Sequence, residues 1–180
     1  MGAAFAQSNE TDVLPARAAA ERAVAQVSAA LSVAPAETAK AVDALTAADI
    51  KGEAIVQTAL QYLGAKYRRG HSGPNAFDCS GFTSYVYGKE SISISRSSRT
   101  QYTEGTPIKS ISDLKKGDLV FFGGSASSKR VGHVGIVTEV DPSGNTFKFV
   151  HAARTGVKVD DSSSAYYARR FLGARRILDN

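Results

Sequence analysis

Cysteine is almost absent from this chain: Cys79 is the only one among 180 residues. A single thiol excludes an intramolecular disulfide and any zinc site built on several thiolates. The sequence also lacks both a His-x-His and a His-Glu-x-x-His spacing, so its three histidines make a poor metal site. We therefore expect neither a metal ion nor another cofactor.

Long apolar runs are lacking too, because no stretch approaches the roughly 20 apolar residues that a membrane span needs. The 22 basic and 17 acidic residues give a net charge of +5. This excess favours anionic surroundings, such as cell-wall polymers, nucleic acid or lipid head groups, without choosing among them. Arginines near the C-terminus alternate with apolar residues and are interpreted as the exposed side of a final strand, so we expect no nucleic-acid site. They are Arg169, Arg170, Arg175 and Arg176.

The first 50 residues contain no glycine after Gly2 and no aromatic residue after Phe5, but 18 alanines. This composition predicts helices over residues 16–31 and 35–45, which would bury little apolar area and dock weakly. We predict an Ala-rich helical leader or linker over residues 1–48 and a second domain over residues 49–180. The composition of the leader indicates no function for it.

Small residues near the N-terminus, Ala3-Ala4-Phe5-Ala6-Gln7, are spaced as at a signal-peptidase site, although no apolar core precedes them. An alanine-rich start would look the same. We favour an exported protein, either periplasmic or extracellular.

From residue 49 onwards the signals for secondary structure are stronger. Apolar residues at helical spacing follow Asp49, a fair N-cap, and Gly64 is a natural end for that helix. The apolar face consists of Ile55, Val56, Ala59, Leu60 and Leu63. A glycine-rich loop over residues 67–77 then leads into a helix that begins at Cys79 and ends near Gly88.

Short β-rich segments follow, at residues 118–122, 131–140, 146–151, 156–159 and 171–178. Pro142 to Asn145 is a strong hairpin signal between the second and third of them. Helices first and strands afterwards predict the α+β class, with N-terminal helices packed on an antiparallel sheet of about five strands.

Cys79 lies in the run Phe77-Asp78-Cys79-Ser80-Gly81-Phe82, on the first turn of the predicted helix. Peptide dipoles and unpaired N–H groups at a helix start favour a thiolate, which is the nucleophilic form. An isolated cysteine is more often an inert buried side chain. A lone cysteine with distant histidines is, however, the pattern of a cysteine hydrolase.

His133 and His151 lie on the two strands of the predicted hairpin, and their midpoint, residue 142, falls in its turn. Each alone would more often be a hydrogen-bonded core histidine. Facing residues of an antiparallel pair are close enough for one imidazole to orient the other. We predict Cys79 as nucleophile, His133 as general base and then acid, and His151 as the group that fixes the His133 tautomer. The backbone N–H of Cys79 would stabilise an oxyanion.

Six separated motifs occur in an order that resembles the NlpC-type family of cell-wall cysteine peptidases. They are Tyr62-Leu63-Gly64-Ala65-Lys66-Tyr67, the Cys79 run, Arg96-Ser97-Ser98-Arg99-Thr100-Gln101, residues 114–122, Gly132-His133-Val134-Gly135-Ile136-Val137 and Phe149-Val150-His151-Ala152. The resemblance covers residue 50 to the C-terminus. It implies a papain-like fold, a Cys-His-His triad and hydrolysis of amide bonds in peptidoglycan stem peptides, typically between D-glutamate and the following diamino acid, commonly diaminopimelate.

The resemblance also implies that Tyr67, Asp78 and Ser80 shape a pocket for the free N-terminal L-alanine of the peptide. A carboxylate such as Asp78 suits an ammonium group. Two departures flank the cleft: Tyr67 is followed by Arg68 and Arg69 in place of a Trp-Gly-Gly-like stretch, and Ser95 stands where proline is common. The two arginines would favour carboxylates on the stem peptide.

The sequence thus favours a monomeric, exported endopeptidase whose partners are peptidoglycan stem peptides. Two alternatives remain open. An acyltransferase would use the same triad and pass the acyl group to an amine or lipid. A non-catalytic domain would bind wall peptides, although all three triad positions carry competent residues.

Overall fold

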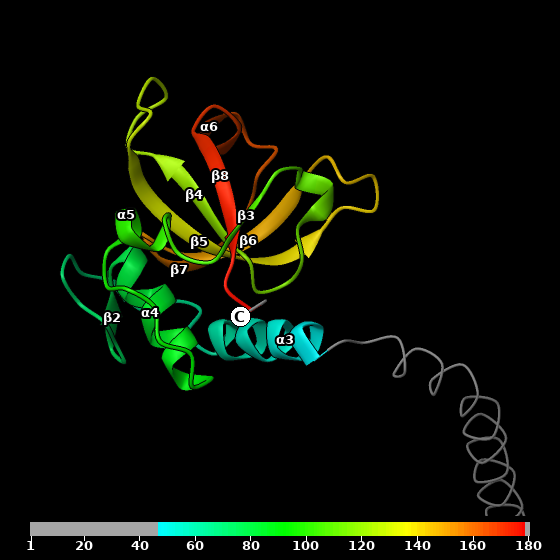
Figure 1. Ribbon diagram of the computed structural model, residues 1–180. Helices are drawn as coiled ribbons and strands as arrows, with labels where there is room; N and C mark the ends of the chain where they lie inside the picture. The colour runs from blue at the N-terminus through cyan, green and yellow to red at the C-terminus, as the bar shows by residue number, and fades with distance from the viewer. Residues whose placement is uncertain (1–46, 179–180) are drawn as a thin grey trace, which may run out of the picture. The chain divides into compact units, whose positions relative to one another are not determined.

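The computed structural model describes residues 47–178, which form an α+β domain (Figure 1). The helices predicted at residues 16–31 and 35–45 lie outside the described residues, so the division of the chain at residue 48 stays a prediction. In Figure 1 the helices α3 and α4 lie next to each other on one side of a curved antiparallel sheet. None of the helices within residues 47–178 has the length and apolar character needed to cross a membrane.

The first described helix, α3 (Ala47–Leu60), buries Gly52, Ile55, Val56 and Ala59 on one face. It begins two residues before Asp49, which therefore lies in the first turn and not at the predicted N-cap. There its carboxylate pairs with Lys115 at 2.9 Å. The helix also ends before Leu63, which is 51% exposed and does not extend the apolar face as predicted.

The loop before Cys79 contains two short strands, β1 (Lys66–Tyr67) and β2 (Ala76–Phe77), which pair in parallel. This pairing brings the two ends of the glycine-rich loop together, and α4 (Cys79–Lys89) begins two residues after β2. The predicted start and end of that helix are confirmed. A short helix, α5 (Ser98–Gln101), follows it.

Six strands form the main sheet in the order β3-β8-β4-β5-β6-β7, with every neighbouring pair antiparallel. They are β3 (Thr106–Ile108), β4 (Leu119–Gly123), β5 (Val131–Val140), β6 (Phe147–Ala153), β7 (Gly156–Asp161) and β8 (Phe171–Arg176). The five predicted strands correspond to β4 to β8. The sixth, β3, escaped prediction because it has three residues with Pro107 at its centre, which only an edge strand tolerates.

Two further short helices lie outside the sheet: the 3₁₀-helix η1 (Ile111–Asp113) and α6 (Ala165–Ala168). Both faces of the sheet are covered, because alternate residues of β4 enter different apolar clusters. Leu119 and Phe121 pack with the helices α3 and α4, whereas Val120 and Phe122 pack on the other face with Phe149. His133 pairs with Phe122 across β4 and β5 and so shares its face.

The predicted hairpin between β5 and β6 is confirmed, but its register differs from the one expected. Ile136 pairs with Val150, and continuing that register places Gly135 opposite His151. His133 is therefore the diagonal neighbour of His151 and not its facing partner. Next to the turn Val140 pairs with Phe147, so the centre of the hairpin lies beyond residue 142. A bulge after Val137 then moves the register by one residue, which a hydrophobic pattern does not reveal.

Gly135 is the residue that permits this diagonal contact, which gives a test of the hairpin. A Cβ at position 135 would lie 2.6 Å from Cδ2 of Phe149 and 3.2 Å from Cβ of His151. Gly135→Ala should therefore destabilise the domain by about 1–3 kcal/mol, measured by thermal or urea unfolding. Gly88→Ala is the matched control, because a Cβ there meets nothing within 4 Å and alanine suits a helix. Equal stability of the two variants would contradict the crowding argument.

Candidate active site

Cys79 is the first residue of α4, directly after the N-cap Asp78. The Asp78 side chain accepts a hydrogen bond from the Gly81 N–H at 2.8 Å, which is the usual way to close a helix start. The thiol is half-buried. It lines a pocket of about 340 Å³ together with His133 and His151. The structure thus brings the three predicted catalytic residues to one cavity.

The surroundings of Cys79 have opposing effects on the pKa of its thiol. Burial raises the pKa of the Cys79 thiol above its ordinary value, and the negative charge of Asp78 adds to this effect. The backbone N–H groups of Ser80, Val134 and Cys79 itself act against it. The expectation that the helix start makes the thiolate the favoured form is therefore wrong in direction: desolvation outweighs the helix N-terminus.

The two histidines are joined directly. Nε2 of His133 lies 2.7 Å from Nδ1 of His151, with the rings nearly perpendicular at an interplanar angle of 86°. His151 is fully buried. Because Nε2 of His133 is occupied by this contact, Nδ1 is the ring nitrogen of His133 that remains for the thiol.

His151 also contacts the carboxylate of Asp160, a residue that the sequence analysis did not identify. Nε2 of His151 lies 2.9 Å from Oδ2 of Asp160. The same oxygen accepts a hydrogen bond from the Tyr167 hydroxyl at 2.9 Å and pairs with the Lys158 ammonium at 2.8 Å. Burial by itself would raise the pKa of Asp160, but the hydrogen bonds from Lys158, His151 and Tyr167 hold it below its ordinary value. Asp160 is therefore ionised at neutral pH.

An ionised carboxylate can only accept hydrogen bonds, and this sets the direction of the whole chain. His151 must donate from Nε2 to Asp160, so its Nδ1 is left as an acceptor. His133 must then donate from Nε2 to His151, which leaves a free lone pair on Nδ1 of His133. Asp160 thus fixes, through His151, the tautomer in which His133 can accept a proton from a thiol.

Both imidazoles are neutral in the resting site. Burial, assisted by His151, lowers the pKa of His133 to about 3. Burial likewise lowers the pKa of His151, against the opposing charge of Asp160. With the pKa of the thiol raised and that of the base lowered, the resting pair consists of a neutral thiol and a neutral imidazole.

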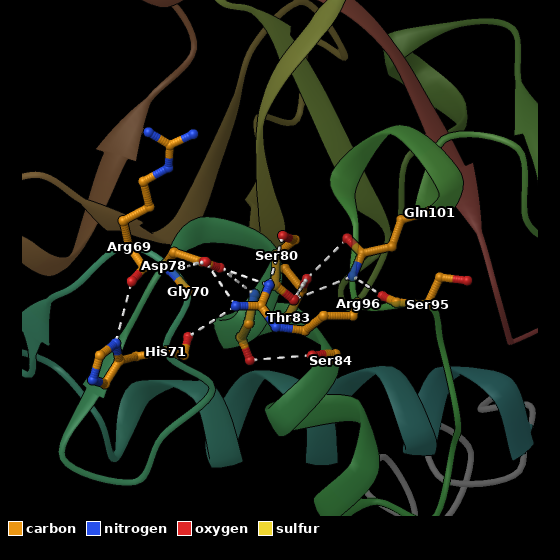
Figure 2. Close-up of polar contacts among 11 residues, drawn as sticks. Arg69, Gly70, His71, Asp78, Ser80, Thr83, Ser84, Ser95, Arg96 and Gln101 are labelled. Atoms are coloured by element: carbon orange, nitrogen blue, oxygen red, sulfur yellow. Dashed lines mark hydrogen bonds and ion pairs between the residues drawn. The ribbon is translucent and has the colours of Figure 1, made fainter.

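Asp78, predicted to bind a substrate ammonium group, is already fully engaged (Figure 2). Its Oδ1 accepts from the Gly81 N–H and from Nη1 of Arg96 at 2.9 Å, and its Oδ2 accepts from the Gly70 N–H and from Nη2 of Arg96, both at 2.7 Å. These bonds occupy about all four lone-pair positions of a carboxylate. Burial would raise the pKa of Asp78, but Arg96 and the two N–H groups lower it below its ordinary value. A substrate ammonium would have to share this carboxylate with Arg96.

Ser80, the second predicted substrate residue, belongs to the same network (Figure 2). Its hydroxyl accepts a hydrogen bond from Arg96 at 3.1 Å. Its carbonyl accepts from the buried Gln101 amide at 3.2 Å, and the same amide also donates to the carbonyl of Ser95. The motif that contains Arg96 and Gln101 therefore ties the start of α4 to the segment leading into α5, which holds Cys79 in place.

Tyr67, the third predicted substrate residue, lies where two pockets meet. We call the pocket that contains His133 and His151 the histidine-side pocket. A neighbouring cavity of about 380 Å³, the serine-side pocket, is lined by Asp78 and Ser80. Tyr67 lines both, as do Cys79 and Gly132. The two pockets therefore adjoin at Cys79 and Tyr67, with Asp78 and Ser80 on one side and the histidines on the other.

Two other predictions concern this region. Of the two arginines that follow Tyr67, Arg69 lines the serine-side pocket. Within residues 47–178 no group of three histidine, cysteine, aspartate or glutamate side chains is placed to hold a metal ion.

The sequence and the fold have counterparts among known proteins. The family model described as "NlpC/P60 family" matches residues 64–176. The chain belongs to the NlpC/P60 family. A probable endopeptidase p60 of Listeria innocua is 40% identical over 124 residues, which are 69% of this chain and 24% of the relative. The probable peptidoglycan endopeptidase LytE of Bacillus subtilis is 34% identical over 122 residues, covering 68% of this chain and 33% of LytE.

A solved structure supports the assignment of the fold. A crystal structure of an NlpC/P60 family protein from Bacillus cereus superposes with a TM-score of 0.62 at 29% identity, covering 71% of this chain and 40% of that protein. The chain spans less than half the length of the two curated relatives named above.

The tautomer argument predicts a spectroscopic effect of replacing Asp160. Asparagine keeps the shape of the side chain but can donate as well as accept, so Asp160→Asn should give mixed tautomers at His151 and His133. Long-range ¹H–¹⁵N spectra of the histidine rings report this directly. In the unaltered protein both rings should show protonated Nε2 at neutral pH.

Asp161→Asn is the matched control, because the Asp161 carboxylate accepts from the Ser163 N–H at 2.7 Å and does not touch the histidines. It should leave the ring spectra unchanged. Unaltered tautomers in Asp160→Asn would show that the carboxylate does not orient the two rings.

Proposed function

We propose that this domain is a cysteine hydrolase, an endopeptidase that cleaves amide bonds in peptidoglycan stem peptides at the D-glutamyl–diamino acid bond, which in many walls is the γ-D-glutamyl–diaminopimelate bond. The observation that carries the proposal is the hydrogen-bond chain from Asp160 through His151 to His133, which ends in the cavity lined by Cys79. Support also comes from the relatives named as endopeptidases. Since peptidoglycan lies outside the cytoplasmic membrane, we further propose that the protein acts there, in the periplasm or the extracellular space.

The reaction would begin at the Cys79 sulfur. Sγ attacks the carbonyl carbon of the scissile amide while its proton passes to Nδ1 of His133, so a C–S bond forms and the carbonyl becomes an oxyanion. The backbone N–H of Cys79 at the helix start is the proposed donor to that oxyanion. His151 and Asp160 stabilise the imidazolium that forms on His133.

Collapse of the tetrahedral intermediate breaks the C–N bond. The departing amine takes the proton from Nδ1 of His133, and the acyl group stays on Cys79 as a thioester. A water molecule then gives a proton to the same nitrogen and attacks the thioester, which restores the thiol and releases a carboxylic acid. Every proton transfer uses one nitrogen, which is the one left free by the tautomer that Asp160 sets.

For substrate binding we retain Tyr67, Asp78 and Ser80 as the proposed contacts to the acyl part of the peptide. All three line the serine-side pocket next to the sulfur. An N-terminal ammonium would approach Asp78 at the edge of its ion pair with Arg96.

Two other functions are compatible with the same chain. An acyltransferase would differ only in what attacks the thioester. A non-catalytic binding domain has no use for an oriented pair of neutral imidazoles beside a thiol, so the hydrogen-bond chain disfavours it.

Digestion of purified muropeptides, with products assigned by mass spectrometry, tests the proposal. The unaltered protein should split stem peptides after D-glutamate. Cys79→Ala should lose at least about 10³-fold in kcat while keeping its melting temperature, and His133→Ala should be nearly as severe. His151→Asn should lose less than His133→Ala, because orientation and not proton transfer is removed.

Outcomes of this digestion separate the three functions. Products in which an added amine replaces water would indicate an acyltransferase. Binding of muropeptides without turnover, equal in the unaltered protein and Cys79→Ala, would indicate a binding domain. Full activity of His133→Ala would remove that residue from the role of base.

The pKa shifts predict an unusual pH profile. Because the pKa of His133 is lowered to about 3, the base stays neutral well below the ordinary histidine pKa of about 6.5. The raised pKa of Cys79 moves the alkaline limit upward. We expect kcat/KM, measured from about pH 4.5 to about pH 9, to show no titration near pH 6.5. An acid limb with an apparent pKa near 6.5 would indicate a solvated imidazole and contradict the burial argument.

A further inference from the structure

The two pockets beside Cys79 must receive different parts of a cleaved peptide. The departing amine has to take its proton from His133, so it must lie within hydrogen-bond reach of that ring. His133 lines the histidine-side pocket and not the serine-side pocket. The fragment that leaves with the amine therefore occupies the histidine-side pocket, and the acyl fragment occupies the other.

Among the described residues, basic side chains and no acidic ones line the histidine-side pocket. Its lining includes Arg154, Lys158 and Arg170, and none of the described residues that line it is an aspartate or glutamate. The serine-side pocket, by contrast, combines Arg69 and Arg99 with the carboxylate of Asp78. A fragment bound in the histidine-side pocket would lie beside positively charged side chains, with no aspartate or glutamate among the described lining residues.

Two of the three cations are not neutralised by a carboxylate. Lys158 is committed to Asp160 at 2.8 Å. Arg170 donates to the carbonyl of Gly124 at 2.8 Å and stacks 4.1 Å above the Tyr166 ring. These contacts hold its guanidinium in place and leave its charge unpaired among the described residues.

Arg154 is the more accessible of the two. It is exposed, and within residues 47–178 its side chain has neither an ion pair nor a hydrogen bond. Burial raises the pKa of Tyr67, and the charge of Arg154 acts against this rise, so the guanidinium lies near the residue at the boundary between the two pockets. Arg154 therefore acts at the point where a peptide would cross the sulfur.

We propose that Arg154 and Arg170 form a carboxylate-binding subsite for the leaving fragment. A guanidinium binds a carboxylate through two parallel hydrogen bonds, which suits recognition of a planar anion. The subsite selects a leaving fragment that carries a free carboxylate and disfavours one whose only side-chain charge is an ammonium. This inference rests on the proposed endopeptidase function and specifies its substrate.

A free carboxylate in the leaving fragment of a stem peptide has two sources. One is the side-chain carboxylate of a diamino dicarboxylic acid such as diaminopimelate. The other is the terminal carboxylate of a short stem. Lysine in the third position supplies only the second. Both sources present the same group to the arginines, so the experiment has to separate them.

Synthetic tetrapeptides L-Ala-γ-D-Glu-X-D-Ala provide the test. Residue X is diaminopimelate, diaminopimelate with an amidated side-chain carboxyl, or lysine, and each peptide is made with a free or an amidated C-terminus. We expect the unaltered enzyme to prefer peptides with the recognised carboxylate by at least about tenfold in kcat/KM. A preference that follows the side chain identifies diaminopimelate, and one that follows the C-terminus identifies the end of the stem.

Variants connect the preference to the subsite. Arg154→Gln and Arg170→Gln should each reduce the ratio of kcat/KM between the acid peptide and its amidated counterpart, mainly through KM. Arg169→Gln is the matched control, because this exposed neighbour of Arg170 does not line the pocket. Arg170→Gln also loses the contact with Gly124, so its melting temperature is compared with that of Arg154→Gln, whose arginine makes no such contact.

Failure of the inference and failure of the proposed function look different in this experiment. Equal kcat/KM for acid and amide peptides, or a preference that survives both arginine variants, would overturn the subsite and leave the endopeptidase intact. Absence of cleavage of every peptide, with Cys79→Ala binding none of them by calorimetry, would overturn both.

Discussion

The chemistry proposed for this domain depends on one hydrogen bond, between Nε2 of His133 and Nδ1 of His151. This bond has a defined direction only because a carboxylate stands at its far end. Asp160, held by Tyr167 and Lys158, can accept but not donate, and this polarity passes through the two rings to Nδ1 of His133. A fold that supplied the rings without the carboxylate would leave the tautomer of the base undetermined.

The scaffold around this contact has two separate tasks. The sheet places both histidines on one face, and a glycine at position 135 leaves room for them to meet diagonally. The position of the Cys79 sulfur depends on the segment around α4. Arg96, which lies after this helix, donates hydrogen bonds to Asp78 and Ser80 and so holds the helix start. The histidines and the helix start are thus positioned by different hydrogen-bond networks, while one apolar core joins the helix to the sheet.

Patterns in the sequence predicted the helix start at Cys79, five of the six strands and the hairpin, because each depends on local spacing and turn residues. What they missed depends on three-dimensional surroundings. The bulge after Val137 shifts the register without a signal in the apolar pattern. Asp160 lies one residue beyond the predicted end at Val159 of its strand, and only the pairing of β6 with β7 brings it to His151. The direction of the Cys79 pKa shift depends on burial, which the helix position alone does not reveal.

The neutral state of the resting thiol has a consequence beyond turnover. Oxidants and electrophiles attack a sulfur anion far faster than a protonated sulfur, so in the proposed reaction Cys79 would be shielded except during its attack on a bound amide. Cys79 has no second cysteine in the chain with which to form a reversible disulfide. Oxidation beyond the sulfenic acid is permanent, so a protonated ground state would lengthen the working lifetime of the proposed catalyst.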